Sequence, residues 1–357
     1  MKFKRVLLEL YYGLRWLLLW PLVLFVRPRP RSGAQHCRIL LIRPDRLGDL
    51  VMTLPLIMNL DQAYPQARID ILVRPYLAGI AGTIPGIDAV LEYTGAKAAV
   101  REIRQRSYDM VFDLVYDYTL ESGLLALFSR APVRVGFAYG RRGCLFSHPV
   151  HVPEKMRGMS AILLEQLRAA GVAVGVRRPM LRVQSKFDGT ADVIALHPGG
   201  FFPSQRWPAE QFAGLGKSLL AHYPQVKLLV IGGPAPADKQ AVDLIVAGLA
   251  SSRVQPVFPE LEQLAGVLSG CKMLVCNNSG PLHLAAAVGI PTVSTLGPTD
   301  ARLWFPAGEH QRVVTRSLPC SPCARRVCRQ HECLEQISVE EMFGCIKAEL
   351  KKIYGLT

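Results

Sequence analysis

The residues best suited to chemistry lie between Cys276 and Leu284, where an apolar run ends in a polar turn and a helix begins. Asn278 and Ser279 are residue types that cap helices, and Pro281 suits the first helical turn. Gly280 lets a ligand approach the backbone. The first N–H groups of a helix have no partner within it and carry the positive end of its dipole, so this turn predicts a phosphate site.

His283 would add a side-chain donor to the same anion. The alternative is a capped helix whose histidine is satisfied within the fold. Two further loops, His197 to Gln205 and Gly232 to Asp238, also follow apolar runs and carry glycine or small polar residues. Three such loops in successive strand–helix units predict a nucleotide or sugar-diphosphate site. Besides the first turn, the residues expected to line it are His197, Gly199, Gly200, Gln205, Arg206 and Gly233.

Three residues near these loops have two interpretations each. Arg206 can pair with a diphosphate or lie exposed, and Trp207 can pack beneath a base or sugar or belong to the core. Asp238 can hold a ribose hydroxyl or act as a partner of the helix dipole. The sequence lacks Gly-x-Gly-x-x-Gly and Gly-x4-Gly-Lys-Ser/Thr, which disfavours dinucleotide oxidoreductases and P-loop phosphotransferases.

A carboxylate in the first half is the candidate for acid–base chemistry. Asp49 follows Gly48 at the start of the first expected helix of that half, where it can act as general base on an acceptor hydroxyl. A helix cap is its alternative role. Asp45 competes for the role of base, but its position within the loop is less constrained.

Alternating apolar runs and helical patterns must position these loops, and they predict two open, mostly parallel α/β sheets. The expected strands are Arg38 to Ile42, Ala67 to Val73, Asp88 to Tyr93, Met110 to Asp113, Val193 to Leu196, Val226 to Ile231, Met273 to Cys276 and Thr292 to Leu296. The expected helices include Leu50 to Ala63, Met156 to Ala170, Ala209 to His222, Ala237 to Gly248 and Leu261 to Ser269.

The length of 357 residues suggests two domains, and the polar run Gln184 to Thr190 is a plausible linker. We expect a leader over residues 1–35, a first domain over 36–185 and a second over 191–357. Sheets of this type bind ligands at the carboxyl ends of their strands, which makes the cleft between the domains the expected active site.

The formal net charge of +14 calls for an acidic partner or surface. Nucleic acid is disfavoured because no nucleic-acid module is recognisable. Seven basic residues and one acidic residue lie between Met1 and Arg31, and they frame the apolar segment Val6 to Val26. We expect this segment to lie in the membrane interface, with Trp16 and Trp20 at headgroup depth and its arginines on anionic lipid. A signal peptide and a single spanning helix are the alternatives.

Five of the nine cysteines are scattered, as in a protein of a reducing cytoplasm. The other four form, with His331, a Cys-x-x-Cys-x4-Cys-x-x-His-x-Cys cluster within loop 320–333. This spacing can hold zinc or can serve packing or a disulfide. The four are Cys320, Cys323, Cys328 and Cys333.

Taken in order, the motifs resemble glycosyltransferase family nine, the lipopolysaccharide heptosyltransferases. They are Ile-Arg-Pro-Asp-Arg-Leu-Gly-Asp, His-Pro-Gly-Gly, Arg-Trp-Pro, Gly-Gly-Pro, Asn-Asn-Ser-Gly-Pro-Leu-His-Leu-Ala and the cysteine cluster. The resemblance covers roughly Arg38 to the C-terminus and leaves the leader outside. It implies a GT-B fold, with two Rossmann-like doubly wound domains facing a central cleft, the acceptor domain first and the nucleotide-sugar domain second.

The resemblance also implies a metal-independent, inverting transfer, usually from ADP-heptose to an inner-core sugar of a lipid A–linked acceptor. By this analogy Asp49 is the catalytic base, with Arg46 and Gly48 beside the acceptor. The diphosphate would be bound by Asn278, Ser279, Gly280 and His283. No metal and no cofactor are expected.

Two departures from the family pattern bear on the donor. Asn278 stands where the family often has Asp, and Gln205 stands where it commonly has Lys. The identity of the sugar nucleotide is therefore open.

The expected partners are a nucleotide-sugar donor, a lipid-linked anionic saccharide acceptor and a membrane surface, with no nucleic acid. The expected location is cytoplasmic and peripheral on the inner membrane. A sugar-nucleotide epimerase or hydrolase of the same fold and a non-enzymatic, membrane-docked zinc adaptor are the competing functions.

Overall fold

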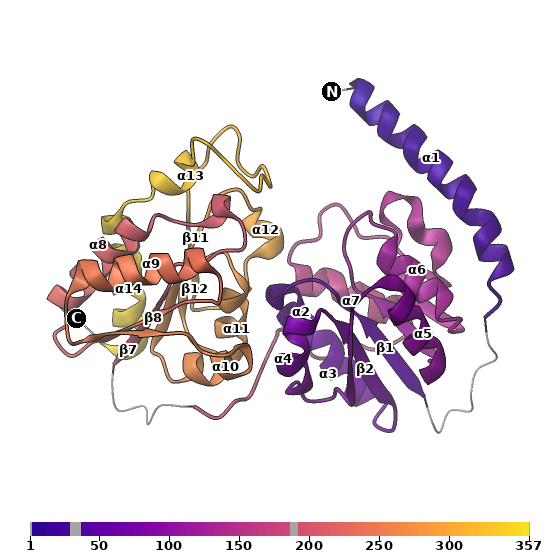
Figure 1. Cartoon of the computed structure of the whole chain (residues 1–357), viewed down its shortest axis with the longest axis horizontal. Coiled ribbons are helices and arrows are strands. Elements are labelled where there is room, and N and C mark those ends of the chain that lie inside the picture. Colours follow the sequence, from indigo (N-terminus) through magenta and orange to yellow (C-terminus); the bar gives the residue numbers. More distant parts are fainter. Residues whose placement is uncertain (1, 29–36, 186–191, 357) are drawn as a thin grey trace. The chain divides into compact units, whose positions relative to one another are not determined.

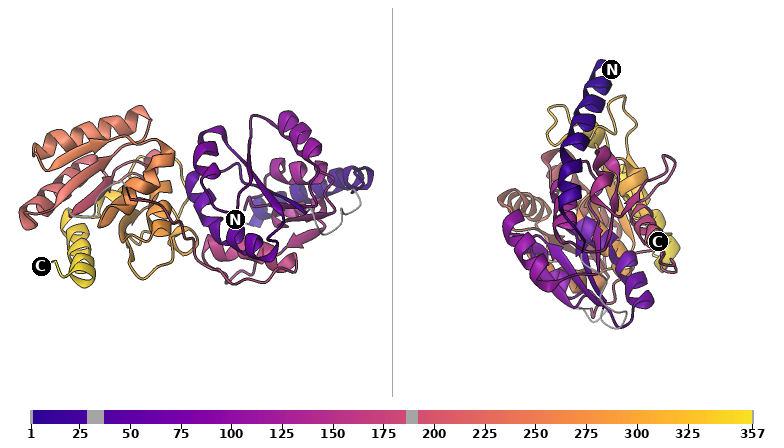
Figure 2. Two further views of the ribbon diagram at one scale, coloured as in Figure 1. Left: turned by 90° about the horizontal axis from the view of Figure 1, so that it is seen from below. Right: turned by 90° about the vertical axis from the view of Figure 1, so that its right-hand side faces the viewer.

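The computed structural model describes residues 2–28, 37–185 and 192–356, and the chain divides into two compact units, Met1–Arg178 and Pro179–Thr357 (Figure 1). Each unit contains one six-stranded sheet in which every neighbouring pair of strands is parallel. Helices cover both faces of each sheet (Figure 2). The strands at the centres of these sheets are continuous apolar runs because they are buried on both faces.

The sheet of the first unit has the order β3-β2-β1-β4-β5-β6. Helices α5 and α6 pack together over one face, and α3 packs with α7. The strands are β1 (Arg38–Ile42), β2 (Arg68–Val73), β3 (Ala89–Glu92), β4 (Met110–Asp113), β5 (Val133–Phe137) and β6 (His148–Val150). The helices are α1 (Lys2–Phe25), α2 (Leu47–Met52), α3 (Leu54–Ala63), α4 (Ala78–Gly82), α5 (Ala96–Arg106), α6 (Glu121–Phe128) and α7 (Met159–Ala169), with 3-10 turns η2 (Pro75–Leu77) and η3 (Tyr139–Leu145).

The sheet of the second unit has the order β12-β11-β10-β7-β8-β9. Helix α8 packs with α9 and α14, and α10 packs with α11. The strands are β7 (Val193–His197), β8 (Lys227–Ile231), β9 (Val254–Val257), β10 (Met273–Asn277), β11 (Thr292–Leu296) and β12 (Gln311–Thr315). The helices are α8 (Ala209–His222), α9 (Pro236–Leu249), α10 (Leu261–Ser269), α11 (Gly280–Val288), α12 (Ala301–Trp304), α13 (Glu332–Glu335) and α14 (Val339–Tyr354), with the 3-10 turn η4 (Pro203–Gln205).

In each sheet, the order in which successive strands are added reverses once. In the first unit the chain builds the sheet outward from β1 and then returns to place β4 on its other side, so the switch point lies between β1 and β4. In the second unit it lies between β7 and β10. Open α/β sheets bind ligands outside the carboxyl ends of the strands at such a point. The fold therefore predicts ligand binding at the loops after β1 and β4 in the first unit and at the loops after β7 and β10 in the second.

Several expected elements differ from those observed. The helix expected from Leu50 to Ala63 is two helices that meet at Thr53, because Pro55 lacks an N–H and is placed in the first turn of the second helix. The helix expected from Met156 begins at Met159, after Gly158 with its positive φ of 82°. Most of the expected linker, and residues 29–35 of the leader, lie outside the described residues. Among the residues that are described, no helix is both long and apolar enough to cross a membrane.

Candidate active site

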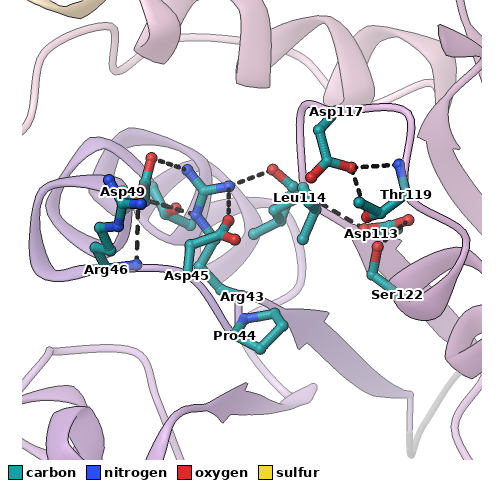
Figure 3. A network of polar contacts seen from close by, with 12 residues as sticks. Arg43, Pro44, Asp45, Arg46, Asp49, Asp113, Leu114, Asp117, Thr119 and Ser122 are labelled. Atoms are coloured by element: carbon teal, nitrogen blue, oxygen red, sulfur yellow. Dashed lines mark hydrogen bonds and ion pairs between the residues drawn. The ribbon is translucent and has the colours of Figure 1, made fainter. Parts of the chain in front are cut away.

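Asp49 lies at the third position of α2, directly after β1, and is held by two groups (Figure 3). Its Oδ2 accepts a hydrogen bond from the Arg46 N–H at 3.3 Å, and its Oδ1 lies 3.5 Å from the Arg43 guanidinium. The Arg43 Nε also donates to the Asp49 carbonyl oxygen at 3.1 Å. The carboxylate thus acts in helix capping and in an ion pair, while its side chain keeps 18% of its surface exposed.

Arg43 is the buried centre of this end of the sheet (Figure 3). Its Nη1 donates to Asp45 Oδ2 at 3.0 Å and also to the carbonyl oxygen of Leu114, which follows β4. One side chain therefore joins the loops after β1 and β4, the two strands at the switch point. Burial, opposed by the Arg43 charge and reinforced by the neighbouring Asp49, raises the pKa of Asp45 to about 6.

A second buried ion pair, between Asp113 and Arg142, supports the loop after β4. Asp113 Oδ2 lies 3.4 Å from Arg142 Nη2 and accepts from the Ser122 hydroxyl at 3.0 Å. Arg142 also donates to the carbonyl oxygens of Phe137 at 3.0 Å and Thr119 at 2.9 Å. Burial raises the pKa of Asp113 against the opposing charge of Arg142. This pair fixes the loop from which the Leu114 carbonyl reaches Arg43.

In the second unit, the expected anion site is the turn that begins α11. Ser279 is the residue that precedes the helix, but within the described chain its side chain accepts no hydrogen bond from the first turn, which corrects the expected cap. Its hydroxyl instead donates to the Asn277 carbonyl oxygen at 3.3 Å and lies 3.4 Å from His197 Nδ1. Within the first turn of α11, Pro281 has no N–H and the Leu282 N–H donates to the Ser279 carbonyl oxygen at 3.2 Å. The backbone donor that this turn can offer a ligand is therefore the Gly280 N–H, and the buried His283 lies in the same helix.

His197 ends β7 on the other side of the switch point and is buried. Burial, together with the nearby Arg206 cation, lowers the pKa of its imidazole to about 4, so the ring is uncharged at neutral pH. Gly199 must lack a side chain here, because a Cβ would lie 2.8 Å from the His197 ring. An uncharged ring beside Ser279 can exchange hydrogen bonds with a phosphate or a sugar hydroxyl without adding charge.

Arg206 and the glycine loops around it form a second part of this site. Its guanidinium lies 2.9 Å from Asp238 Oδ1 and donates to the Gly200 carbonyl oxygen at 2.9 Å. A Cβ on Gly233 would lie 2.5 Å from Asp238 Oδ2, so the loop after β8 must approach this pair as bare backbone. Burial raises the pKa of Asp238 while Arg206 opposes the shift. The Arg206 guanidinium is thus oriented by the Gly200 carbonyl oxygen on one side and by the Asp238 carboxylate on the other.

Asn277 lies in the expected polar turn but was not named as a site residue, and its amide joins both ends of the loop between β7 and α8 to strand β11. Its Oδ1 accepts from the Trp207 backbone N–H and the Thr295 hydroxyl, each at 2.9 Å. Its Nδ2 donates to the carbonyl oxygens of Pro198 at 2.7 Å and Gly199 at 3.2 Å. The sequence signal was available, since an asparagine at the end of a buried strand must find partners for its amide. Trp207 itself is a core residue, buried with its Nε1 donating to the Ile337 carbonyl oxygen at 3.0 Å.

The cysteine loop borders this site through backbone contacts. Ser204, in the turn before Gln205, donates from its hydroxyl to the Arg325 carbonyl oxygen at 2.6 Å. The N–H groups of Cys323 and Ala324 donate to the Pro298 carbonyl oxygen, after β11. Gln205 Nε2 donates to the Thr299 hydroxyl at 3.3 Å, in the same loop as Pro298. All nine cysteines, each a described residue, are free thiols, and no group of three or more His, Cys, Asp or Glu within the described ranges could hold a metal ion.

The structure therefore brings the expected residues together in two groups. Asp49, Arg46 and Gly48 lie at the switch point of the first unit. In the second unit the loops that carry His197, Gly199, Gly200, Gln205, Arg206, Gly233, Asn278, Ser279, Gly280 and His283 lie after β7, β8 and β10. Both groups lie at the carboxyl ends of the strands of their sheet, where α/β proteins bind ligands.

Comparison with known proteins identifies the family. The model of glycosyltransferase family 9 (heptosyltransferase) matches residues 97–334. The chain belongs to this family. It is therefore an enzyme, a glycosyltransferase, and the interpretation as a non-enzymatic adaptor is wrong.

Two curated relatives of this glycosyltransferase illustrate the likeness. Lipopolysaccharide heptosyltransferase 2 of Escherichia coli strain K12 is 27% identical over 313 residues, which are 78% of this chain and 87% of the relative. Lipopolysaccharide heptosyltransferase 1 of Pseudomonas aeruginosa is 26% identical over 316 residues, which are 82% of this chain and 87% of the relative.

Solved structures show the same fold. E. coli ADP-heptose LPS heptosyltransferase II superimposes with a TM-score of 0.73 at 22% identity and covers 88% of this chain and 99% of its own. E. coli heptosyltransferase WaaC with ADP gives a TM-score of 0.71 at 21% identity over 87% of this chain and 99% of its own. A further structure shows WaaC with ADP-2-deoxy-2-fluoro heptose, at a TM-score of 0.68 and 21% identity over 87% of this chain and 99% of its own. The two Rossmann-like units of this glycosyltransferase are thus of GT-B type.

Proposed function

We propose that this glycosyltransferase moves a heptose from a nucleotide sugar, ADP-heptose, to the core of lipopolysaccharide or a related lipid-linked acceptor. The observation that carries the proposal is that each sheet has candidate reactive or binding groups at its switch point. An oriented carboxylate lies at one, and a helix turn with an uncharged histidine lies at the other. The names of the relatives and the ADP complexes of WaaC support the sugar and the nucleotide.

In the proposed reaction Asp49 is the general base. Its carboxylate takes the proton of the acceptor hydroxyl while that oxygen attacks the anomeric carbon in line, and the bond from this carbon to the diphosphate oxygen breaks. The configuration inverts, and the nucleoside diphosphate leaves. Arg43 contributes by fixing the direction of the carboxylate, as its contact with Oδ1 and its bond to the Asp49 carbonyl oxygen support.

The leaving diphosphate gains charge as the bond breaks, and the second unit supplies donors for it. The Gly280 N–H at the start of α11, the Ser279 hydroxyl, His283 and Arg206 are proposed to meet this charge. Such a set stabilises the leaving group without a metal ion, so we propose a metal-independent transfer. Asn278, Gly280, Gly199, Gly200, Gly233 and Gln205 complete the proposed donor site.

The two units take different substrates in this proposal. The first, with Arg46 and Gly48 beside Asp49, receives the anionic saccharide acceptor, and the second receives the nucleotide sugar. Because the acceptor carries a lipid, we propose that the chain works on the cytoplasmic face of the inner membrane as a peripheral protein. The net charge of +14 supports this location.

Replacement of Asp49 tests the mechanism. Asp49→Asn keeps the shape of the side chain but removes the base, so turnover should fall on the order of 10²- to 10⁴-fold. ADP affinity, measured by calorimetry, should stay within about twofold, since a change of this size is less than 1 kcal/mol. Asp61→Asn, an exposed carboxylate on α3, is the matched control and should keep full turnover.

Full turnover by Asp49→Asn would show that another group is the base. Release of altered sugar nucleotide in the absence of acceptor would instead favour an epimerase or hydrolase. Following both the donor and the glycosylated acceptor by mass spectrometry separates these outcomes.

A further inference from the structure

Helix α1 has two different sides. One side packs on the first unit, where Arg15 is only 6% exposed and Leu19 is buried in the core cluster that also contains Leu125. The other side is apolar and exposed, with Leu18 reaching 71% exposure. The exposed apolar residues of this side are Tyr11, Leu14, Trp16, Leu17, Leu18, Trp20, Leu24 and Phe25.

This exposed side carries no charge along about four helical turns. Between Leu10 and Val26 the sequence contains one charged residue, Arg15, and its side chain lies on the packed side. A helix that is apolar all round requires cover on every side. Since the first unit covers one side of α1, the other side predicts contact with a second apolar phase.

Helix α1 is held on the first unit by a hydrogen bond and by close packing. The Arg15 guanidinium donates to the Tyr118 carbonyl oxygen and lies 5.8 Å from the centre of the Tyr12 ring. Gly140, with φ of 60°, permits the close approach, because a Cβ there would lie 2.8 Å from Tyr118 Cβ and 3.3 Å from Tyr12 Cε1. Arg15 therefore holds the helix and is not available to lipid, which corrects the expected role of this arginine.

The basic residues that flank the apolar stretch indicate whether a bilayer or a second copy of the helix covers its exposed side. Lys2, Lys4 and Arg5 precede the apolar stretch, and the exposed Arg27 follows it. Two copies of this helix packed side by side would bring these like charges together. An anionic bilayer instead attracts them, at about 1 kcal/mol for each basic residue near its surface. Trp16 and Trp20, stacked with ring centres 5.4 Å apart and both exposed, suit the interface between headgroups and acyl chains.

We propose that the exposed side of α1 is a docking surface for an anionic phospholipid bilayer, in which the helix lies along the membrane plane. This inference deepens the membrane association proposed above and rests on it. The hydrogen bond from Arg15 to the Tyr118 carbonyl oxygen also orients α1 relative to the sheet, because Tyr118 lies in the loop that follows β4. The same loop region begins with Leu114, whose carbonyl oxygen accepts from Arg43 beside Asp49. Docking of α1 thus sets the angle at which the Asp49 end of the sheet meets a lipid-linked acceptor.

Co-sedimentation of the full chain with vesicles tests the surface. The chain should bind vesicles of phosphatidylcholine with phosphatidylglycerol far better than vesicles of phosphatidylcholine alone, and salt should weaken the binding. Leu18→Glu should lower the vesicle affinity at least about tenfold, since it puts a charge where an exposed apolar side chain would enter the bilayer. Leu244→Glu makes the same change at an exposed leucine of α9 and should leave the affinity unchanged.

Three results would overturn the inference. They are equal loss of binding in both variants, equal binding to the two vesicle types, or a lipid-free dimer that Leu18→Glu dissociates in analytical ultracentrifugation. Turnover on a deacylated, water-soluble acceptor is measured alongside. If Leu18→Glu loses vesicle binding but keeps normal turnover on that acceptor, the proposed transfer reaction is unaffected by the result on docking. If the unaltered chain binds vesicles but shows no turnover, the proposed transfer reaction is refuted and the docking surface is not.

Discussion

Arg43 places one buried cation between two carboxylates with different surroundings. Asp45 lies 3.0 Å from the guanidinium, and Asp49 lies 3.5 Å from it. Burial raises the pKa of Asp45 to about 6, so this carboxyl group takes up a proton more readily in the folded chain than in the unfolded chain. Asp45 therefore carries an unfavourable charge at neutral pH.

The raised pKa of Asp45 has a definite sign for stability. Between about pH 4 and pH 6 the folded chain holds this proton and the unfolded chain has lost it, so the contribution of Asp45 to stability falls as the pH rises through this range. Asp45→Asn does not titrate and escapes the penalty. The free energy of unfolding of this variant, relative to the unaltered chain, should increase by up to about 3 kcal/mol from pH 4 to pH 8.

Urea unfolding of the two chains at several pH values, followed by circular dichroism, measures this difference. A difference that stays constant across the range would show that Asp45 has an ordinary pKa. Only the change with pH counts, because the loss of the Arg43 contact adds a constant term.

At the scale of elements, Asn277 explains how separate loops become one site. Its amide links the end of β10 to the loop after β7, to Trp207 before α8 and to Thr295 on β11. These segments are far apart in the sequence and meet only because β7, β10 and β11 are adjacent in the sheet. One buried side chain therefore holds the loop after β7, which we propose to bind the donor, against the ends of β10 and β11.

Asn277→Ala should lower the free energy of unfolding by about 2–4 kcal/mol, because it leaves buried donors and acceptors without partners. ADP affinity should fall as well, since the loop carrying Gly199 loses its anchor. Asn278→Ala is the matched control, because Asn278 is only half-buried. It should weaken ADP binding with little change in stability.

Thermal unfolding and calorimetric ADP titration of both variants separate the two roles. Equal stability of the two variants would contradict the positioning role of Asn277. Unchanged ADP affinity of Asn278→Ala would remove Asn278 from the proposed donor site.

At the scale of the whole molecule, the tie between Arg15 and Tyr118 couples docking to catalysis. Arg15→Met should leave vesicle binding in place, because the exposed side of α1 is intact. It should nevertheless lower turnover on a vesicle-embedded acceptor several-fold, since the Asp49 end of the sheet loses its fixed orientation. Turnover on the deacylated acceptor should not change.

Arg27→Met is the matched control, because Arg27 is an exposed arginine at the end of the same segment. It should weaken vesicle binding about fivefold, which corresponds to about 1 kcal/mol, without a further loss of turnover once the protein is bound. Equal turnover of bound Arg15→Met and bound Arg27→Met would show that orientation is not set by this tie.

Much of the architecture follows from local patterns. The strands Arg38–Ile42, Met110–Asp113 and Thr292–Leu296 and the helices Ala209–His222 and Leu261–Ser269 lie where the sequence predicts them, because strong apolar periods and flanking turn residues act over a few positions. The strands β5, β6, β9 and β12 were not predicted. Those toward the edges of a sheet are short or only partly buried, as β9 and β12 are, and carry a weaker apolar signal.

The sequence by itself determined the character of the chemistry. The residue types that begin a helix act through adjacent positions, so Asn278 to Pro281 predict an anion site without any knowledge of the tertiary structure. The roles of other side chains came only from the tertiary contacts. Trp207 belongs to the core, Arg15 to the packing of α1, and Asp49 to a cation, because each outcome depends on which distant strand or loop lies beside it. Such neighbours are set by the order of strands in the sheet, and no local spacing of residues encodes that order.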